Sequence, residues 1–308
     1  MNAIMARRFA DFVEIRTKAA SILPLLAAVA YVFYKQGWFN VQNTVVFTAA
    51  VFLFDMATTA INNYAEDRTS KGRAYFSGSV PLILIFVMFA AAAVLGLYLA
   101  YLCGIVALAV GIVCFAVGVL YSFGPLPISR TPFGEVCSGG IMGFCIIFLA
   151  VYINSSRDAL INVSTLFPVF NVSVNIPNLF FLALLSFPYI CFISNIMLAN
   201  NLCDIEKDVA VKRHTLPYFL GVRKSLGLFK LLYYAAMAAI VLLVLTGAVP
   251  LISIFTLLAM IKIRHNIAAF KEKQSKSETF PLSVYNLYLF SAPFTLLILA
   301  KGLINVLI

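Results

Sequence analysis

The chain has 308 residues, of which 63% are hydrophobic and only 11% are charged, and its mean hydropathy is +1.00. Because soluble proteins carry about 25% charged residues, this composition excludes a soluble enzyme, a disordered chain and a disulfide scaffold. It predicts an all-α, multi-pass membrane helical bundle that forms a single domain, residues 1–308, in a lipid bilayer. The net charge of +10 is typical of the basic loops of such a protein, and we expect no nucleic-acid partner.

Uninterrupted apolar runs predict the membrane helices, because a helix that spans a bilayer needs about 20 apolar residues. We place nine such helices, of which the eighth is the shortest, with a tight turn at Gly104 between the third and the fourth. The predicted ranges are 18–36, 43–65, 80–102, 104–122, 134–153, 177–200, 225–247, 249–263 and 282–306.

The positions of lysine and arginine predict the orientation of these helices. If the N-terminus is cytoplasmic, only Lys35, Arg157 and Lys301, of 22 basic residues, fall in outer segments. Cytoplasmic loops of membrane proteins are enriched in Lys and Arg. We therefore predict a cell-membrane protein with a cytoplasmic N-terminus, an outer loop near 154–176, and an outer C-terminus.

Acidic residues gather at the ends of predicted helices two and six. Residues 62–67 read NNYAED and residues 200–208 read NNLCDIEKD, so the two runs align at an offset of 138 positions. Both helices are predicted to run in the same direction. The repeat predicts two related helical halves that bring motifs at 62–70 and 200–217 to one cytoplasmic cavity.

The spacing within each motif predicts a metal site. Residues four apart share one face of a helix, so Asn62 points with Glu66, and Asp204 with Asp208. Stacked carboxylates repel one another unless a cation lies between them, and oxygen ligands suit Mg²⁺ shared with phosphates. The predicted metal ligands are Asn62, Glu66, Asp67, Asp204 and Asp208. The basic neighbours predicted to neutralise a bound diphosphate are Arg68, Lys71, Arg73, Lys212 and Arg213.

Asp55 lies inside the second predicted helix, about two turns before Asn62. A carboxylate within a membrane segment indicates a functional residue. A buried residue that hydrogen-bonds to a neighbouring helix is the alternative interpretation, and the sequence leaves both open.

The second motif continues with Lys212-Arg213-His-Thr-Leu-Pro and Gly221. This run resembles the UbiA superfamily of intramembrane prenyltransferases and, within it, the MenA-type branch of 1,4-dihydroxy-2-naphthoate polyprenyltransferases. Two further stretches are similar to the family: residues 121–125 with 133–135, and Arg16-Thr17 with Pro24. The resemblance therefore spans about residues 14–225. The first motif departs from the family pattern, because Asn63 and Ser70 stand at positions where the family has aspartate.

The resemblance implies a Mg²⁺-dependent transferase that moves a polyprenyl group from polyprenyl diphosphate to an aromatic acceptor. The acceptor it implies first is 1,4-dihydroxy-2-naphthoate, in (demethyl)menaquinone biosynthesis. The catalytic residues it implies are Asp204, Asp208, Glu66 and Asp67. The residues expected to bind the diphosphate or the acceptor are Arg16, Arg68, Lys71, Arg130, Lys212, Arg213, Tyr64, Tyr121, Asn200 and Asn201.

Three alternatives remain at this stage. In the first alternative, the enzyme prenylates a different aromatic acceptor, of the 4-hydroxybenzoate, homogentisate or haem-precursor type. In the second alternative, the protein is a secondary transporter. Such proteins place charges and broken helices at the membrane midplane, whereas the carboxylates of this chain lie at helix ends, which argues against this alternative. In the third alternative, the protein is a relative of these enzymes that binds or transports lipid without catalysis, which the less acidic first motif permits.

Overall fold

The structure is a computed structural model of the chain. It describes all residues except 1, 70–74, 77, 125–126, 157–158 and 167–168. For residues 2–3, 16, 66–69, 165–166 and 169–170 the description covers the backbone alone. Among the described residues, nine helical segments are long and apolar enough to cross a membrane, which confirms the predicted fold class. Helices form here because lipid offers no partner for backbone N–H and C=O groups, which must bond within the segment.

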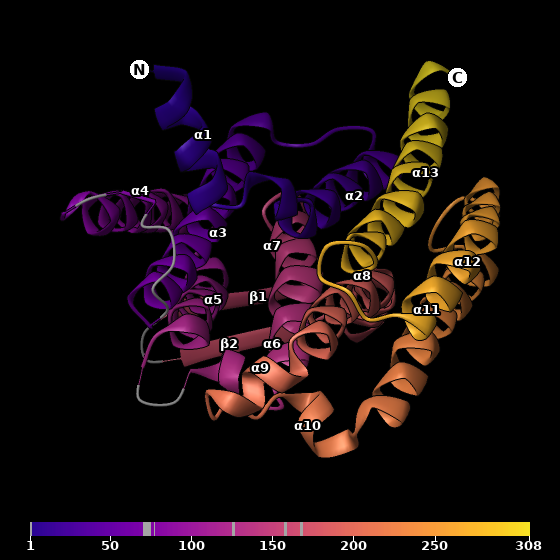
Figure 1. Ribbon diagram of the computed structural model, residues 1–308. Coiled ribbons are helices and arrows are strands. Elements are labelled where there is room, and N and C mark those ends of the chain that lie inside the picture. Colours follow the sequence, from indigo (N-terminus) through magenta and orange to yellow (C-terminus); the bar gives the residue numbers. More distant parts are fainter. Residues whose placement is uncertain (1, 70–74, 77, 125–126, 157–158, 167–168) are drawn as a thin grey trace.

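The elements follow the predicted order along the chain (Figure 1). The first half contains α1 (Asn2–Phe12), η1 (Ile15–Thr17), α2 (Ala19–Gln36), α3 (Val41–Thr69), α4 (Val80–Cys103), α5 (Ile105–Ser122) and η2 (Ile128–Arg130). The second contains α6 (Gly134–Ser138), η3 (Gly139–Cys145), α7 (Ile146–Tyr152), β1 (Ile161–Leu166), β2 (Val169–Val174), α8 (Ile176–Cys203), α9 (Ile205–Ala210), α10 (Leu216–Leu220), α11 (Val222–Leu245), η4 (Leu251–Leu258), α12 (Ala259–Glu272) and α13 (Phe280–Leu307).

Aromatic side chains join the central helices into one core. The Phe192 ring of α8 stacks on Phe290 of α13, with centroids 4.6 Å apart, and meets Tyr233 of α11 edge-on at 4.9 Å. All three are fully buried. A smaller core around Phe12, Met56 and their neighbours packs α1 against α3 and α4. In Figure 1 the group α3, α4 and α5 lies on one side of α7 and α8, and α11, α12 and α13 lie on the other.

Two glycines let η3, a π-helical turn, approach α8 very closely. A Cβ added at Gly143 would lie 2.6 Å from the backbone nitrogen of Ile190, and one at Gly139 would lie 2.2 Å from Ser194 Oγ. Glycines four residues apart allow such contact between membrane helices. The close packing also fixes α6, since Ser194 donates a hydrogen bond of 2.9 Å to the Glu135 carbonyl.

Two features differ from the sequence-based expectation. The outer segment near 154–176 contains an antiparallel hairpin, β1–β2, with Ile161 opposite Val174. The eighth span, predicted at 249–263, runs over Leu251–Glu272, because α12 continues the 3₁₀ helix η4. Lys262, Arg264 and Lys271 thus all lie on this helix. The predicted turn at Gly104 is present, with a φ of 95°.

Candidate active site

The second acidic motif begins where α8 ends. Asn200 lies in the last turn of α8, and Asp204 follows the helix with a φ of −108°, which separates α8 from α9. Lys276, from the loop between α12 and α13, donates to Asp204 Oδ2 at 2.6 Å and also to Asn200 Oδ1. Asp204, a predicted metal ligand, and Asn200, predicted to bind substrate, thus share the ammonium group of Lys276.

Asp208 lies one turn further on, and its backbone N–H bonds to the Asp204 carbonyl at 2.8 Å. Lys212 has a left-handed φ of 56°, which turns the chain back so that the Arg213 guanidinium lies 3.6 Å from Asp208 Oδ1. Burial raises the pKa of the Asp208 carboxyl, Arg213 lowers it in part, and the negative charge of Asp204 raises it. The other oxygen, Oδ2, is buried without a hydrogen-bond partner among the described residues.

Behind these carboxylates lies a buried polar layer. Asn201 is 1% exposed and donates from Nδ2 to Glu135 Oε1 at 2.9 Å. The Tyr121 hydroxyl and the second Glu135 oxygen are buried without hydrogen-bond partners in the described part of the chain. Arg213 Nε donates to the Ser129 carbonyl at 3.0 Å. Asn201, predicted to bind substrate, instead holds Glu135, because its side chain is enclosed between α8 and α6.

The first motif lies on α3. Asn62 is half-buried, whereas Asn63 is buried and donates from Nδ2 to the Phe12 carbonyl at 2.9 Å. The second asparagine of each motif thus has the same arrangement, buried and bonded to another element. Tyr64 packs against the smaller core. The remaining residues predicted here lie outside the described side chains: Glu66, Asp67 and Arg68 are described by their helical backbone alone, and Lys71 and Arg73 are not described.

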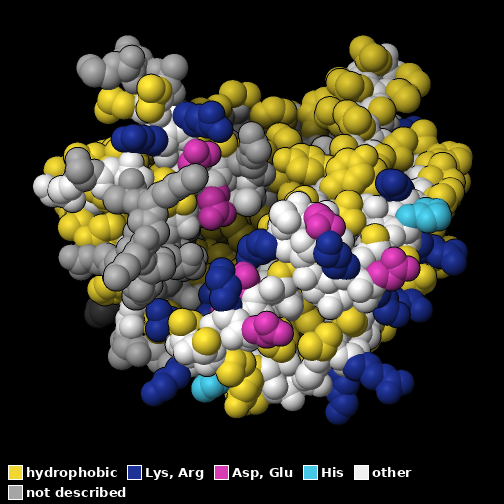
Figure 2. Space-filling view, viewed as in Figure 1, with side chains coloured by type: hydrophobic (Ala, Val, Ile, Leu, Met, Phe, Trp, Pro, Cys, Tyr) yellow, Lys and Arg dark blue, Asp and Glu magenta, His cyan; other side chains and the backbone are white. Residues whose placement is uncertain are grey.

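The other predicted binding residues are more exposed or lie elsewhere. Lys212 and Arg130 are exposed, and the Arg130 carbonyl accepts a hydrogen bond from the backbone N–H of His214 at 3.2 Å. Arg16 belongs to η1, and its side chain lies outside the description. On the face shown in Figure 2, Asp and Glu side chains, magenta, lie near the centre with Lys and Arg, dark blue, around them.

Asp55 has a structural explanation. Its Oδ1 accepts from Lys18 Nζ at 2.8 Å and its Oδ2 from Ser21 Oγ at 2.6 Å, and all three residues are buried. Of the two interpretations left open by the sequence, the geometry favours a hydrogen-bonded link between α2 and α3. The pairing compensates both buried charges.

Two residues of this site were absent from the predicted set. Glu135 is a carboxylate at the start of an apolar span, a signal by which it is recognisable in the sequence. Lys276 lies 72 residues beyond Asp204, and no local pattern marks it. In the described side chains no group of three His, Cys, Asp or Glu is arranged to hold a metal ion, so a metal here needs amide oxygens, substrate oxygens or the first motif as further ligands.

Comparison with known proteins gives consistent matches. The profile of the UbiA prenyltransferase family matches residues 21–291. The 1,4-dihydroxy-2-naphthoate octaprenyltransferase of Bacillus subtilis (strain 168) is 29% identical over 248 residues, which are 75% of this chain and 72% of that protein.

Solved structures share the fold. A UbiA homologue from Archaeoglobus fulgidus, bound to GPP and Mg²⁺, matches with a TM-score of 0.65 and 14% identity over 98% of this chain and 100% of that one. A structure of digeranylgeranylglyceryl phosphate synthase matches with a TM-score of 0.66 and 16% identity over 97% and 98% of the two chains. At these identities the likeness extends to the fold alone.

Proposed function

The chain is an enzyme of the UbiA prenyltransferase family, whose profile covers residues 21–291, and on this basis we propose that it transfers a polyprenyl group from polyprenyl diphosphate to an aromatic acceptor. We propose 1,4-dihydroxy-2-naphthoate as the acceptor, and (demethyl)menaquinone biosynthesis as the setting. The support is the relative from Bacillus subtilis, which is named for that acceptor, together with the run around residues 204–217.

The observation that carries the proposal is the ammonium group of Lys276, which the oxygen atoms of the second motif hold. Asn200 and Asp204 already surround the Lys276 ammonium, and the nearby Asp208 has a buried oxygen without a hydrogen-bond partner in the described structure. This oxygen-rich set fits Mg²⁺. The residues that would hold Mg²⁺ are Asp204, Asp208 and Asn200, with Asn62, Glu66 and Asp67 from the first motif by sequence. When bound, Mg²⁺ neutralises the diphosphate leaving group.

The chain's own cations would bind the rest of the diphosphate charge. Arg213 lies beside Asp208, and Lys276 lies beside Asp204, which the exposed Lys207 also approaches at 3.7 Å. In the reaction the bond between C1 of the prenyl group and oxygen breaks, and the electron pair leaves with diphosphate. C1 then bonds to an electron-rich ring carbon, which loses its carboxyl group as CO₂. Behind the carboxylates, Glu135 orients Asn201 through its hydrogen bond.

We propose as well that the chain consists of two related helical halves and that its N-terminus lies in the cytoplasm. The repeat at 62–70 and 200–217 is supported by the matching arrangement of Asn63 and Asn201. The distribution of Lys and Arg supports a cytoplasmic N-terminus and a cytoplasmic opening of the site.

The test is a product assay with purified protein, a polyprenyl diphosphate, Mg²⁺ and each of three acceptors: 1,4-dihydroxy-2-naphthoate, 4-hydroxybenzoate and homogentisate. We expect a prenylated, decarboxylated naphthoate by mass spectrometry and no product with excess EDTA. A preference for another acceptor would refute the naphthoate proposal. Retention of prenyl diphosphate without product from any acceptor would indicate a lipid-binding relative.

Variants of α9 test the site itself. We expect Asp208→Asn to lower the rate by at least about tenfold, because a charged ligand facing the diphosphate is lost. Glu206→Gln is the matched control, since Glu206 is an exposed acid on the same helix. Equal rates for the two variants, at equal thermal stability, would contradict the assignment of Asp208.

A further inference from the structure

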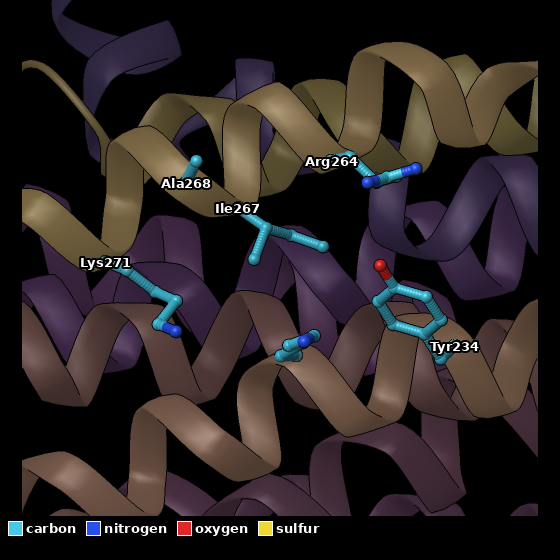
Figure 3. A pocket seen from close by; sticks show the side chains of 6 residues that line it. Tyr234, Arg264, Ile267, Ala268 and Lys271 are labelled. Carbon is cyan, nitrogen blue, oxygen red and sulfur yellow. The ribbon is translucent and has the colours of Figure 1, made fainter.

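A groove of about 360 Å³ lies between α11 and α12, and no residue of the two motifs lines it. Figure 3 shows its walls, with Tyr234 on one helix pointing toward Arg264 on the other. The residues that line it are Lys230 and Tyr234 of α11 and Arg264, Ile267, Ala268 and Lys271 of α12. Lys230 and Tyr234 are four positions apart, and the α12 residues lie three, four and seven positions after Arg264, so each helix turns a single face to the groove.

The groove carries an excess of positive charge. Lys230, Arg264 and Lys271 are exposed, and none forms an ion pair with any described residue. The Lys230 ammonium lies 5.5 Å from the centroid of the Tyr234 ring. Ile267, 4% exposed, forms the floor, and the short side chain of Ala268 leaves the space open. Lys and Arg donors gathered in this way suit a phosphate group.

The groove lies where the apolar parts of both helices end. Residues 231–245 of α11 and 249–261 before and within α12 contain no charged residue, and the first charges reached are Lys230 and Lys262. Both charged ends lie near the second motif, because α11 begins directly after α10 and the end of α12 leads into the loop whose Lys276 contacts Asp204. The groove is therefore at the level where hydrocarbon meets lipid headgroups, a level at which long basic side chains reach the polar layer.

A second hollow continues the groove along α12, lined by Met260, Ile261, Arg264, His265 and Ala268. It has a volume of about 530 Å³ and shares Arg264 and Ala268 with the groove, while Met260 and Ile261 extend it about one turn deeper. A ligand that uses both spaces has a negatively charged head and an apolar tail. We propose that the groove binds the phosphate of an anionic phospholipid, with an acyl chain along Met260 and Ile261. Basic pockets between membrane helices bind such headgroups in other proteins.

The proposal is tested by lipid binding alone, independently of catalysis. The purified full chain in a nonionic detergent is titrated with short-chain phosphatidylglycerol or phosphatidylcholine, and bound lipid is counted by native mass spectrometry. We expect tighter binding of phosphatidylglycerol, and about five-fold weaker binding after each of Lys230→Gln, Arg264→Gln and Lys271→Gln. Lys262→Gln is the control, because Lys262 is exposed on the same helix but does not line the groove.

A second variant separates shape from charge. Ala268→Leu keeps every charge but fills the groove, so we expect it also to weaken phosphatidylglycerol binding. Equal binding of the two lipids would overturn the proposal, as would an equal effect of Lys262→Gln and Arg264→Gln, which would indicate general surface charge. Displacement of the lipid by inorganic phosphate or geranyl diphosphate at equal concentration would also overturn it, since the groove would then be a site for soluble anions or substrate.

Discussion

Removal of the Lys276 ammonium tests whether this side chain competes with Mg²⁺ at the second motif. Its Nζ lies 2.6 Å from Asp204 Oδ2, and the Lys276 and Asp204 side chains are 48% and 19% exposed. Half-exposed ion pairs of this kind contribute about 0.5–1 kcal/mol after solvent screening. Because Mg²⁺ binding at Asp204 must break this pair, Lys276→Met should lower the Mg²⁺ concentration for half-maximal rate by about two- to five-fold.

The assay is the initial rate of prenyl transfer over a Mg²⁺ titration at saturating substrates. Lys273→Met is the matched control, since Lys273 lies in the same loop but pairs with Glu278 at 2.7 Å and does not contact the motif. Raising the KCl concentration should reduce the difference between Lys276→Met and the wild type, because salt screens exposed charges. An unchanged or higher Mg²⁺ requirement in Lys276→Met would refute the competition.

Two further predictions concern packing and orientation. Gly143→Ala should destabilise the protein by about 1–3 kcal/mol, because its Cβ meets the backbone of α8, whereas Gly140→Ala, with open space around it, should leave the thermal unfolding temperature unchanged. Equal unfolding temperatures for the two variants would contradict the close contact. For orientation, Ser156→Cys and Ser277→Cys, each in a background without the six native cysteines, should react with a membrane-impermeant thiol reagent from opposite sides. Position 156 should label in intact cells and position 277 only after lysis; labelling of both from one side would reject the proposed orientation.

The sequence by itself determined the membrane bundle and the positions of its spans. The bilayer is the reason, because a long apolar segment in lipid can hydrogen-bond its backbone N–H and C=O groups within itself only as a helix. The second motif was also visible, since Asp204 and Asp208 are local in sequence and stand out against so apolar a chain. The end of the eighth span was missed because Lys262 and Arg264 mark the depth at which hydrocarbon ends, whereas helix α12 continues beyond that depth to Glu272.

Only the tertiary structure decided which groups face the motif carboxylates. The contact of Glu135 with Asn201 depends on the approach of η3 to α8, which the absent side chains of Gly139 and Gly143 permit. Lys276 reaches Asp204 because the loop after α12 folds over the end of α8. Such contacts join residues far apart in the sequence, so helix periodicity and charge counts carry no signal for them. They follow from the shapes of whole helices packed together, as does the alignment of Lys230 with Arg264 across the α11–α12 groove.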